Sequence, residues 1–213
     1  SGNDAYGVSA AQKGGYGSTK TYQATGINIY DKDGAAFTLN GNLDMKVKGV
    51  GVDMRGSEKN AVTIAGGTIF TPDDGEEASY KAVAATSGTF AMGMNDAKTG
   101  SNGKDVVVQG TISLGKKGTV DLGLGSSKSR WTGIADNKDG HPMNLYLSDG
   151  GMWENRRTSK DQYGLFAGSR VTKVAGGTAP AKAGVIVQKD SNPITIDHYS
   201  GHTILVYDHE ASS

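Results

Sequence analysis

The sequence predicts an all-β fold in which short strands stack as a β-solenoid with irregular loops, and three observations predict it. The chain holds 33 glycines in 213 residues but only 4 prolines, and the glycines lack the regular spacing of collagen, so they serve turns and close backbone approaches. From residue 22 onward, apolar and polar residues alternate in short runs, the period of strands with one buried face. The same pattern of strand and corner returns along the chain.

Glycine marks the corners between these predicted strands. Within residues 43–47 the odd positions are apolar, whereas in residues 50–54, after Gly49, the even positions are apolar. A switch of parity at a glycine indicates a corner or a bulge. Gly-Thr pairs followed by an apolar residue indicate further corners at Gly88 and Gly118.

The strand after Gly118 has the clearest alternation of apolar and polar residues. We expect Val120, Leu122 and Leu124 to point into the core, because alternate side chains of a strand share one face. Asp121, between them, is expected to point outward into solvent.

A weak internal repeat favours stacked coils over a β-sandwich or a propeller, although short strands and glycine turns suit those folds too. Residues 62–69 align with residues 106–112 at an offset of 44 positions. Coils of about 22 residues at the ~4.8 Å spacing of paired strands give roughly nine coils and a rod of about 45 Å. The expected irregular loops are residues 71–80, 95–104, 135–142 and 154–163.

The chain divides into two predicted regions. Residues 1–20, which show no sustained period, are interpreted as a loose N-terminal lead-in or cap, and residues 21–213 as the solenoid. No apolar stretch approaches the roughly 20 residues that span a bilayer. The opening Ser1-Gly2 resembles the remnant of a cleaved tag, so a leader or anchor is expected to lie outside the given sequence.

Charge and cysteine content exclude several function classes. Lysine plus arginine and aspartate plus glutamate both number 22, so no basic field exists to gather nucleic acid or acidic lipid, and no nucleic-acid partner is expected. The absence of cysteine excludes disulfides, thiolate catalysis and cysteine-bearing zinc sites.

No metal site or cofactor is expected from the remaining candidates. His198 and His202 have the spacing of a helical zinc pair, but strand-like residues flank them and no glutamate follows His198. The acidic run at residues 73–77 lacks the ligand spacing of a calcium loop. Residues 31–34 and 137–140 are predicted turns because each pairs aspartate or asparagine with glycine.

The residues around the two tryptophans resemble the passenger domains of Gram-negative autotransporter adhesins. The resemblance lies in Ser129-Arg130-Trp131-Thr132-Gly133, in residues 144–153 ending at Trp153, in residues 184–201 and in residues 42–49. It implies a right-handed parallel β-helix displayed on the bacterial surface and attached to the outer membrane through a C-terminal translocator barrel, which this chain lacks. Absence of cysteine agrees with that family.

The function implied by this resemblance is that of a non-catalytic passenger segment, an adhesin or rigid display scaffold. Its partners would be a host, bacterial or matrix surface protein or glycan, and its own translocator barrel. The alternative is a carbohydrate-active β-helix enzyme, a lyase or glycosidase, that uses strand-borne carboxylates. Asp44, Asp53 and Asp121 are the outward carboxylates for that alternative; no catalytic residue is assigned.

Residues 154–163 form the most mixed of the predicted loops and are the expected binding region. Arginine beside aromatic residues favours binding hot spots, so we expect contacts from Trp153, Arg156, Arg157 and Tyr163. Trp131 and Trp153 have a second interpretation, as packing residues that fill glycine-flanked corners.

Overall fold

Strands make up almost all of the regular structure. A computed structural model describes residues 5–10, 12–13, 21–22, 24–73, 79–160, 168–189, 191 and 193–208. The strands are β1 (Ala5–Ala10), β2 (Gln12–Lys13), β3 (Thr21–Tyr22), β4 (Ala24–Tyr30), β5 (Ala36–Val47), β6 (Gly49–Arg55), β7 (Ala61–Phe70), β8 (Lys81–Met92), β9 (Val106–Gln109), β10 (Thr111–Leu124), β11 (Arg130–Gly133), β12 (Ala135–Asp136), β13 (Met143–Leu147), β14 (Met152–Asn155), β15 (Ser169–Ala175), β16 (Gly184–Gln188), β17 (Ile194–Ser200) and β18 (Thr203–Tyr207). The helix among the described residues is one 3₁₀ turn, η1 (Pro180–Lys182), so the all-β prediction is confirmed.

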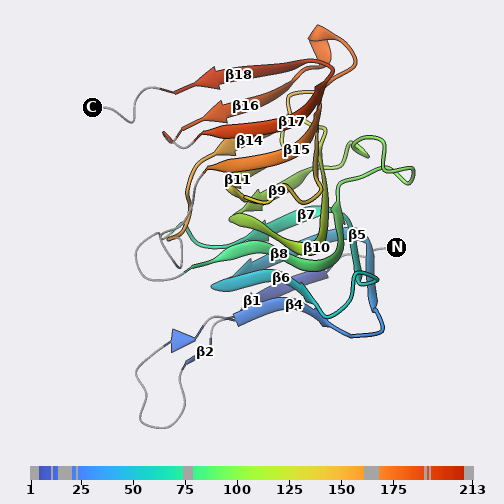
Figure 1. Cartoon of the computed structure of the whole chain (residues 1–213), viewed down its shortest axis with the longest axis vertical. Coiled ribbons are helices and arrows are strands. Elements are labelled where there is room, and N and C mark those ends of the chain that lie inside the picture. Colours follow the sequence, from blue (N-terminus) through green and yellow to red (C-terminus); the bar gives the residue numbers. More distant parts are fainter. Residues whose placement is uncertain are drawn as a thin grey trace.

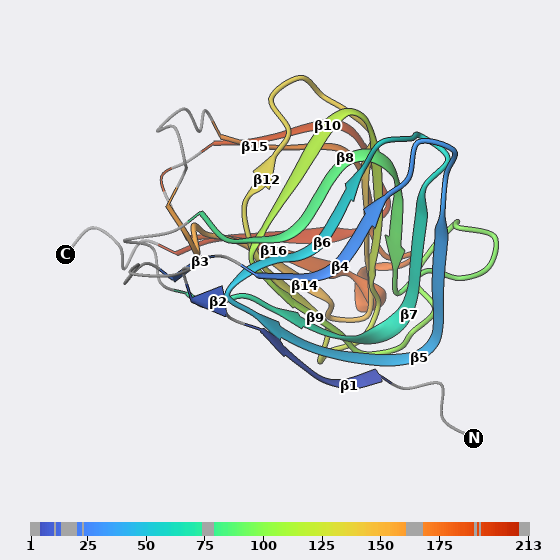
Figure 2. The ribbon, with the colours of Figure 1, turned by 90° about the horizontal axis from the view of Figure 1, so that it is seen from below.

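The strands form one large parallel sheet that curls around a central core (Figures 1 and 2). Sixteen strands belong to this sheet, and β2 and β3 form a separate antiparallel pair. Parallel neighbours need long connections, and here each connection is a further pass of the chain around the core. This arrangement is consistent with a β-solenoid.

Successive passes pair in three stacks, each named after one of its strands. The β6 stack consists of β4, β6, the start of β8, the start of β10, and β12. The β13 stack consists of the starts of β5 and β7, the ends of β8 and β10, β13, and the ends of β15 and β17. The β14 stack consists of β1, the ends of β5 and β7, β9, β11, β14, β16 and β18.

The predicted glycine corners are confirmed. β5 ends at Val47 and β6 begins at Gly49, where a Cβ atom would lie 2.0 Å from the Ala24 carbonyl oxygen. Gly88 and Gly118 pair with each other at the points where β8 and β10 pass from the β6 stack to the β13 stack. Gly88 has a φ of 99°, which glycine adopts without strain.

The spacing between coils differs from the sequence repeat. Val106 pairs with Gly67 and not with Val62, whose own partner is Phe90, so the alignment of residues 62–69 with 106–112 is wrong. The loop between β8 and β9 lengthens one pass: Ile69 pairs with Val108, 39 positions later, whereas Trp131 pairs with Trp153, 22 positions later. The β14 stack holds eight strands among the described residues, against the roughly nine coils expected.

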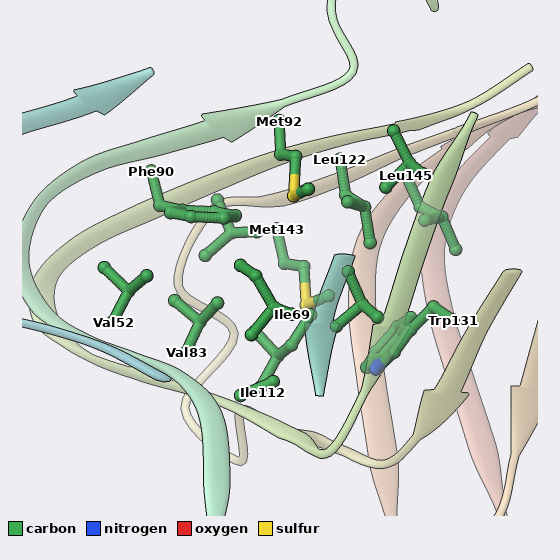
Figure 3. Packing of buried hydrophobic residues seen from close by; sticks show 14 of the residues in the cluster. Val52, Ile69, Val83, Phe90, Met92, Ile112, Leu122, Trp131, Met143 and Leu145 are labelled. Atoms are coloured by element: carbon green, nitrogen blue, oxygen red, sulfur yellow. The ribbon is translucent and has the colours of Figure 1, made fainter. Parts of the chain in front are cut away.

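The core lies inside the curl and is a set of ladders, each built from the inward residue of successive strands (Figure 3). In the β13 stack one ladder joins Ile64, Met92, Leu122 and Leu145, all almost fully buried. Figure 3 shows Met92, Leu122 and Leu145 side by side, with Ile69, Ile112 and Trp131 facing them from the other stacks. Inward side chains within a stack therefore pack both along the stack and across the core, whereas Leu205 of the last strand, β18, is 53% exposed.

The two tryptophans are part of this core. Trp131 and Trp153 are fully buried and occupy paired positions of β11 and β14. Their rings stack at 4.9 Å with an interplanar angle of 6°, close to the strand spacing. Trp131 Nε1 donates to the Gly110 carbonyl and Trp153 Nε1 to the Gly133 carbonyl, each at 3.0 Å. Both indoles are thus satisfied inside the core, and the packing interpretation is confirmed.

The alternation predicted for β10 is confirmed, but the exposure of Asp121 is not. Val120, Leu122 and Leu124 are fully buried in the core, and Asp121 lies on the opposite face of the strand. That face is covered, because Asp121 is only 7% exposed and its Oδ1 accepts a hydrogen bond of 2.8 Å from Asn144 Nδ2. At Gly123, on the same face, a Cβ would lie 3.1 Å from Ser101 Cα, so the loop after β8 packs over this part of the sheet.

Replacing Leu122 by aspartate is expected to lower the free energy of unfolding by about 3 kcal/mol or more, because an unpaired carboxylate would enter the core. Asp121→Asn is the matched control, because its amide oxygen still accepts from Asn144 and the expected loss is only about 1 kcal/mol. Urea denaturation of both variants measures the difference. Equal losses would show that the assigned faces of β10 are wrong.

Candidate functional site

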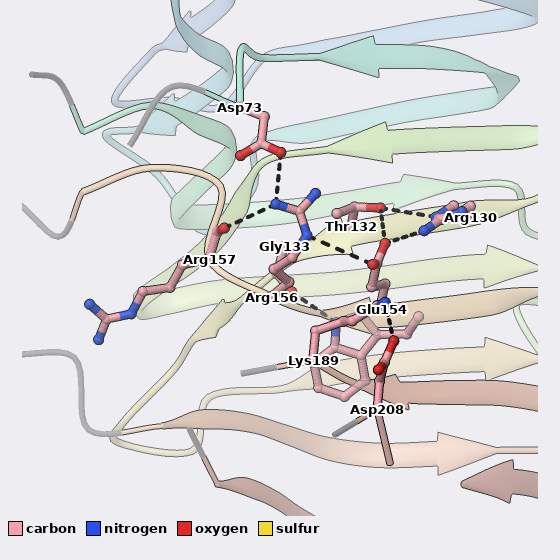
Figure 4. Close-up of polar contacts among 10 residues, drawn as sticks. Asp73, Arg130, Thr132, Gly133, Glu154, Arg156, Arg157, Lys189 and Asp208 are labelled. Atoms are coloured by element: carbon pink, nitrogen blue, oxygen red, sulfur yellow. Dashed lines mark hydrogen bonds and ion pairs between the residues drawn. The ribbon is translucent and has the colours of Figure 1, made fainter. Parts of the chain in front are cut away.

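A cluster of charged side chains lies on the outer face of the β14 stack, where β14 ends (Figure 4). We call it the corner site and define it as Asp73, Arg130, Thr132, Glu154 and Arg156. Thr132 and Glu154 are adjacent because they occupy paired positions of β11 and β14. Trp131 and Trp153 point inward from the same strands, so the residues beside them point outward.

Glu154 is the centre of the corner site. Its side chain is only 5% exposed, and Oε2 contacts the Arg130 Nη2 group. The Thr132 hydroxyl donates to the same oxygen at 3.1 Å, and Arg130 Nε donates to that hydroxyl oxygen at 3.1 Å. On the other side, Arg156 Nε lies 3.7 Å from Oε1. A buried carboxylate is thus held between two guanidinium groups and one hydroxyl.

Arg156 joins two loops that are far apart in the sequence. Its Nη1 donates to Asp73 Oδ2 at 2.7 Å, across 83 positions of the chain. Ser159 Oγ donates to the Tyr80 carbonyl at 2.9 Å, which ties the same two segments together. The described parts of the predicted loops at 71–80 and 154–163 therefore meet at one corner of the sheet.

The arginines fix the charge state of Glu154. Burial of the carboxyl raises its pKa and is the largest single influence, but the hydrogen bond and charge of Arg130, the Thr132 hydroxyl and the charge of Arg156 together outweigh it. The pKa of Glu154 consequently lies below its ordinary value. A carboxylate so held is a poor proton donor, so its position suits recognition and structure better than acid catalysis.

The residues predicted to bind a partner differ in how accessible they are. Trp153 is fully buried, so its ring cannot contact a partner. Arg156 lies in the corner site with its side chain 30% exposed. Arg157 is exposed, and its carbonyl accepts from Arg156 Nη1 at 3.4 Å. Tyr163 lies outside the described residues.

Sequence reasoning missed the role of Arg130 and Asp73 in this cluster. Arg130 is half exposed, with 50% of its side chain accessible, and Asp73 is 42% exposed. Arg130 directly precedes the inward Trp131, so it was detectable as an outward position opposite in charge to Glu154, but only once β11 and β14 are placed in register. Asp73 offers no such signal, since a loop brings it there.

The carboxylates considered for glycoside cleavage do not gather. Asp44 lies in the β14 stack beside Thr68, Asp53 in the β6 stack beside Ala84, and Asp121 in the β13 stack beside Ala91. Asp53 instead pairs with Arg55 at 3.5 Å. Glycosidases use two carboxyl groups within about 10 Å of each other, and none of these three occupies a position paired with another of them.

Replacing Glu154 by glutamine is expected to lower the free energy of unfolding by about 2 kcal/mol at neutral pH, since charge-assisted bonds to Arg130 and Arg156 are lost. Because folding depresses the pKa of Glu154, its contribution is complete above the unfolded pKa and is lost as the pH falls through the folded pKa. Urea midpoints of wild type and variant should therefore differ more at pH 7 than at pH 3, because the difference begins to shrink only below the ordinary glutamate pKa of 4.5. A difference that is the same at both pH values would contradict this role.

The described residues contain no group of three or more histidine, aspartate or glutamate side chains placed to hold a metal ion; His198 lies in β17 and His202 after it. In the same part of the chain no helix is long and apolar enough to cross a membrane. Comparison of the chain with family models, curated proteins and solved structures found no match.

Proposed function

We propose that this chain is a non-catalytic passenger segment of a bacterial autotransporter, folded as a right-handed parallel β-helix and acting as an adhesin or a rigid display scaffold. The observation that carries the proposal is the stacking of Trp131 on Trp153 in neighbouring parallel strands. These are the two tryptophan segments on which the resemblance to autotransporter passengers rests. The two segments occupy paired positions in neighbouring strands, as repeated segments of a stacked β-structure would.

The distribution of side chains supports a binding or spacing role over a catalytic one. Inward positions are committed to packing, and the outward carboxylates Asp44, Asp53 and Asp121 lie on separate stacks. Polar groups available to a partner therefore lie on lateral faces and loops, where Arg130 and Arg156 are partly exposed. A surface or matrix protein or a glycan is the class of partner that such shallow surfaces fit.

Stacked coils suit display outside a cell for a physical reason. Each coil rests on its neighbours, so stability grows along the rod without disulfide bonds, and this chain has no cysteine. We place the protein at the bacterial surface, attached to the outer membrane through a C-terminal translocator barrel that would be its intramolecular partner. Detection of the segment on intact cells by externally added protease or antibody tests this localisation, and a purely internal protein would contradict it.

Attachment by cells that display the full protein is expected to weaken about tenfold when Arg156 and Arg157 are both replaced by alanine, because arginine is a frequent hot-spot residue. Removal of Arg156 also breaks its pairs with Asp73 and Glu154, so a stability loss of about 1 kcal/mol accompanies the change. From the sequence alone, which assigns residues 154–163 to a surface loop, the double replacement is expected to leave the melting temperature unchanged.

The matched control replaces Lys116 and Lys117 by alanine, because both are exposed in β10 and their removal changes the net charge by the same amount. Attachment should stay unchanged in this control. Equal weakening by both pairs would indicate a general charge effect, and no weakening by the arginine pair would remove the corner site as a contact surface.

A further inference from the structure

A groove beside the loop between β8 and β9 has the features of a binding site. The loop between β8 and β9 projects from the body (Figures 1 and 2) and forms one wall, and strands β5, β7 and β8 of the β13 stack form the floor. The groove has a volume of about 660 Å³, within the range of small-ligand sites. We call it the loop groove.

The wall of the loop groove is preformed. Asn95 holds the loop closed, since its Oδ1 accepts from the Thr99 backbone at 2.9 Å and its Nδ2 donates to the Thr99 hydroxyl at 3.0 Å. Asn102 Nδ2 donates to the Ala65 carbonyl at 2.9 Å, which fastens the loop to β7. The Tyr146 hydroxyl donates to the Lys98 carbonyl at 3.3 Å. A loop fixed in this way loses little entropy when it binds.

The polar groups of the groove have unused bonding capacity. Among the described residues, the Lys98 ammonium and the Asp96 carboxylate have no hydrogen-bond or ion-pair partner. Lys104 Nζ makes a single contact, of 3.4 Å, to the Asn40 carbonyl. The Thr63 hydroxyl and the Asn40 amide also line the groove. Lys98 has a φ of 54°, a backbone conformation that glycine or asparagine adopts more readily, so a lysine stands there at some cost.

This geometry points to a short anionic saccharide as the ligand of the loop groove, with its carboxylate held by one of the two lysines, Lys98 or Lys104. Hydroxyl groups of the sugar match Asp96, Asn40 and Thr63, and the side chain of Met94 offers an apolar contact for the sugar ring. The inference does not rest on the proposed function, because it follows from the groove alone.

An acidic peptide fits less well. Peptides commonly bind a sheet by adding a strand to an open edge. At the floor of the groove β7 is paired on both sides, with β5 and with β8, so a strand could be added only beside the start of β5, at the margin of the groove. Two lysines with one aspartate also give too little positive charge for nucleic acid.

Titration of the isotope-labelled full chain with 3′-sialyllactose and trigalacturonic acid, followed by amide NMR shifts, tests the inference. The amides of residues 94–104 should shift, and the neutral counterparts lactose and cellotriose should bind at least about tenfold more weakly. The double variant Lys98→Gln and Lys104→Gln should weaken binding about tenfold, and added salt should weaken it further.

Lys116→Gln with Lys117→Gln is the matched control, because these exposed lysines lie on β10 outside the groove. It should bind the acidic sugars as the wild type does. The inference is overturned if neither acidic sugar shifts these amides, if neutral sugars bind equally, if a hexaglutamate peptide binds the groove as tightly, or if the groove variant behaves like the control.

Discussion

Parallel pairing in register is the constraint on which the rest of this structure depends. When one pass of the chain pairs with the next in parallel, each residue lies beside its counterpart at the strand spacing. Inward residues then form ladders, such as Ile64, Met92, Leu122 and Leu145, and outward residues form rows of their own. A buried apolar side chain at one position therefore favours another at the paired position.

The tryptophan pair shows how this constraint joins packing to the candidate site. Trp131 and Trp153 stack inward and donate to glycine carbonyls one coil earlier, which fixes β11 against β14. The residues one position further along, Thr132 and Glu154, then meet on the outer face. The guanidinium of Arg130 lies beside them. The register that builds the core thus also assembles the charged cluster.

Much of the local structure could be predicted from the sequence because it depends on short-range patterns. The alternation of apolar and polar residues predicted the inward face of β10. The change in which positions are apolar, at Gly49, predicted the corner between β5 and β6. The offset between coils could not be predicted, since the loop after β8 adds residues to one pass without disturbing the ladder. Alternation also assigns Asp121 to the outer face, but it carries no information on the loop that covers that face.

The candidate site was less predictable because its contacts join distant segments. Arg156 was identified from its loop, but its partner Asp73 lies 83 positions away. Trp153 was expected both to bind and to pack, and the buried ring packs. The loop groove could not be predicted from the sequence, because Asn95 and Asn102 shape its wall only through hydrogen bonds that form in the folded loop.

Cross-strand nuclear Overhauser effects in the full chain test the central claim, the parallel stacking in register, most directly. The account predicts backbone contacts that link Val108 to Trp131, Trp131 to Trp153 and Trp153 to Ile186, in that order and with the pattern of parallel strands. Contacts of antiparallel type between these strands, or contacts of Trp131 with a sequence neighbour in place of Trp153, would contradict it.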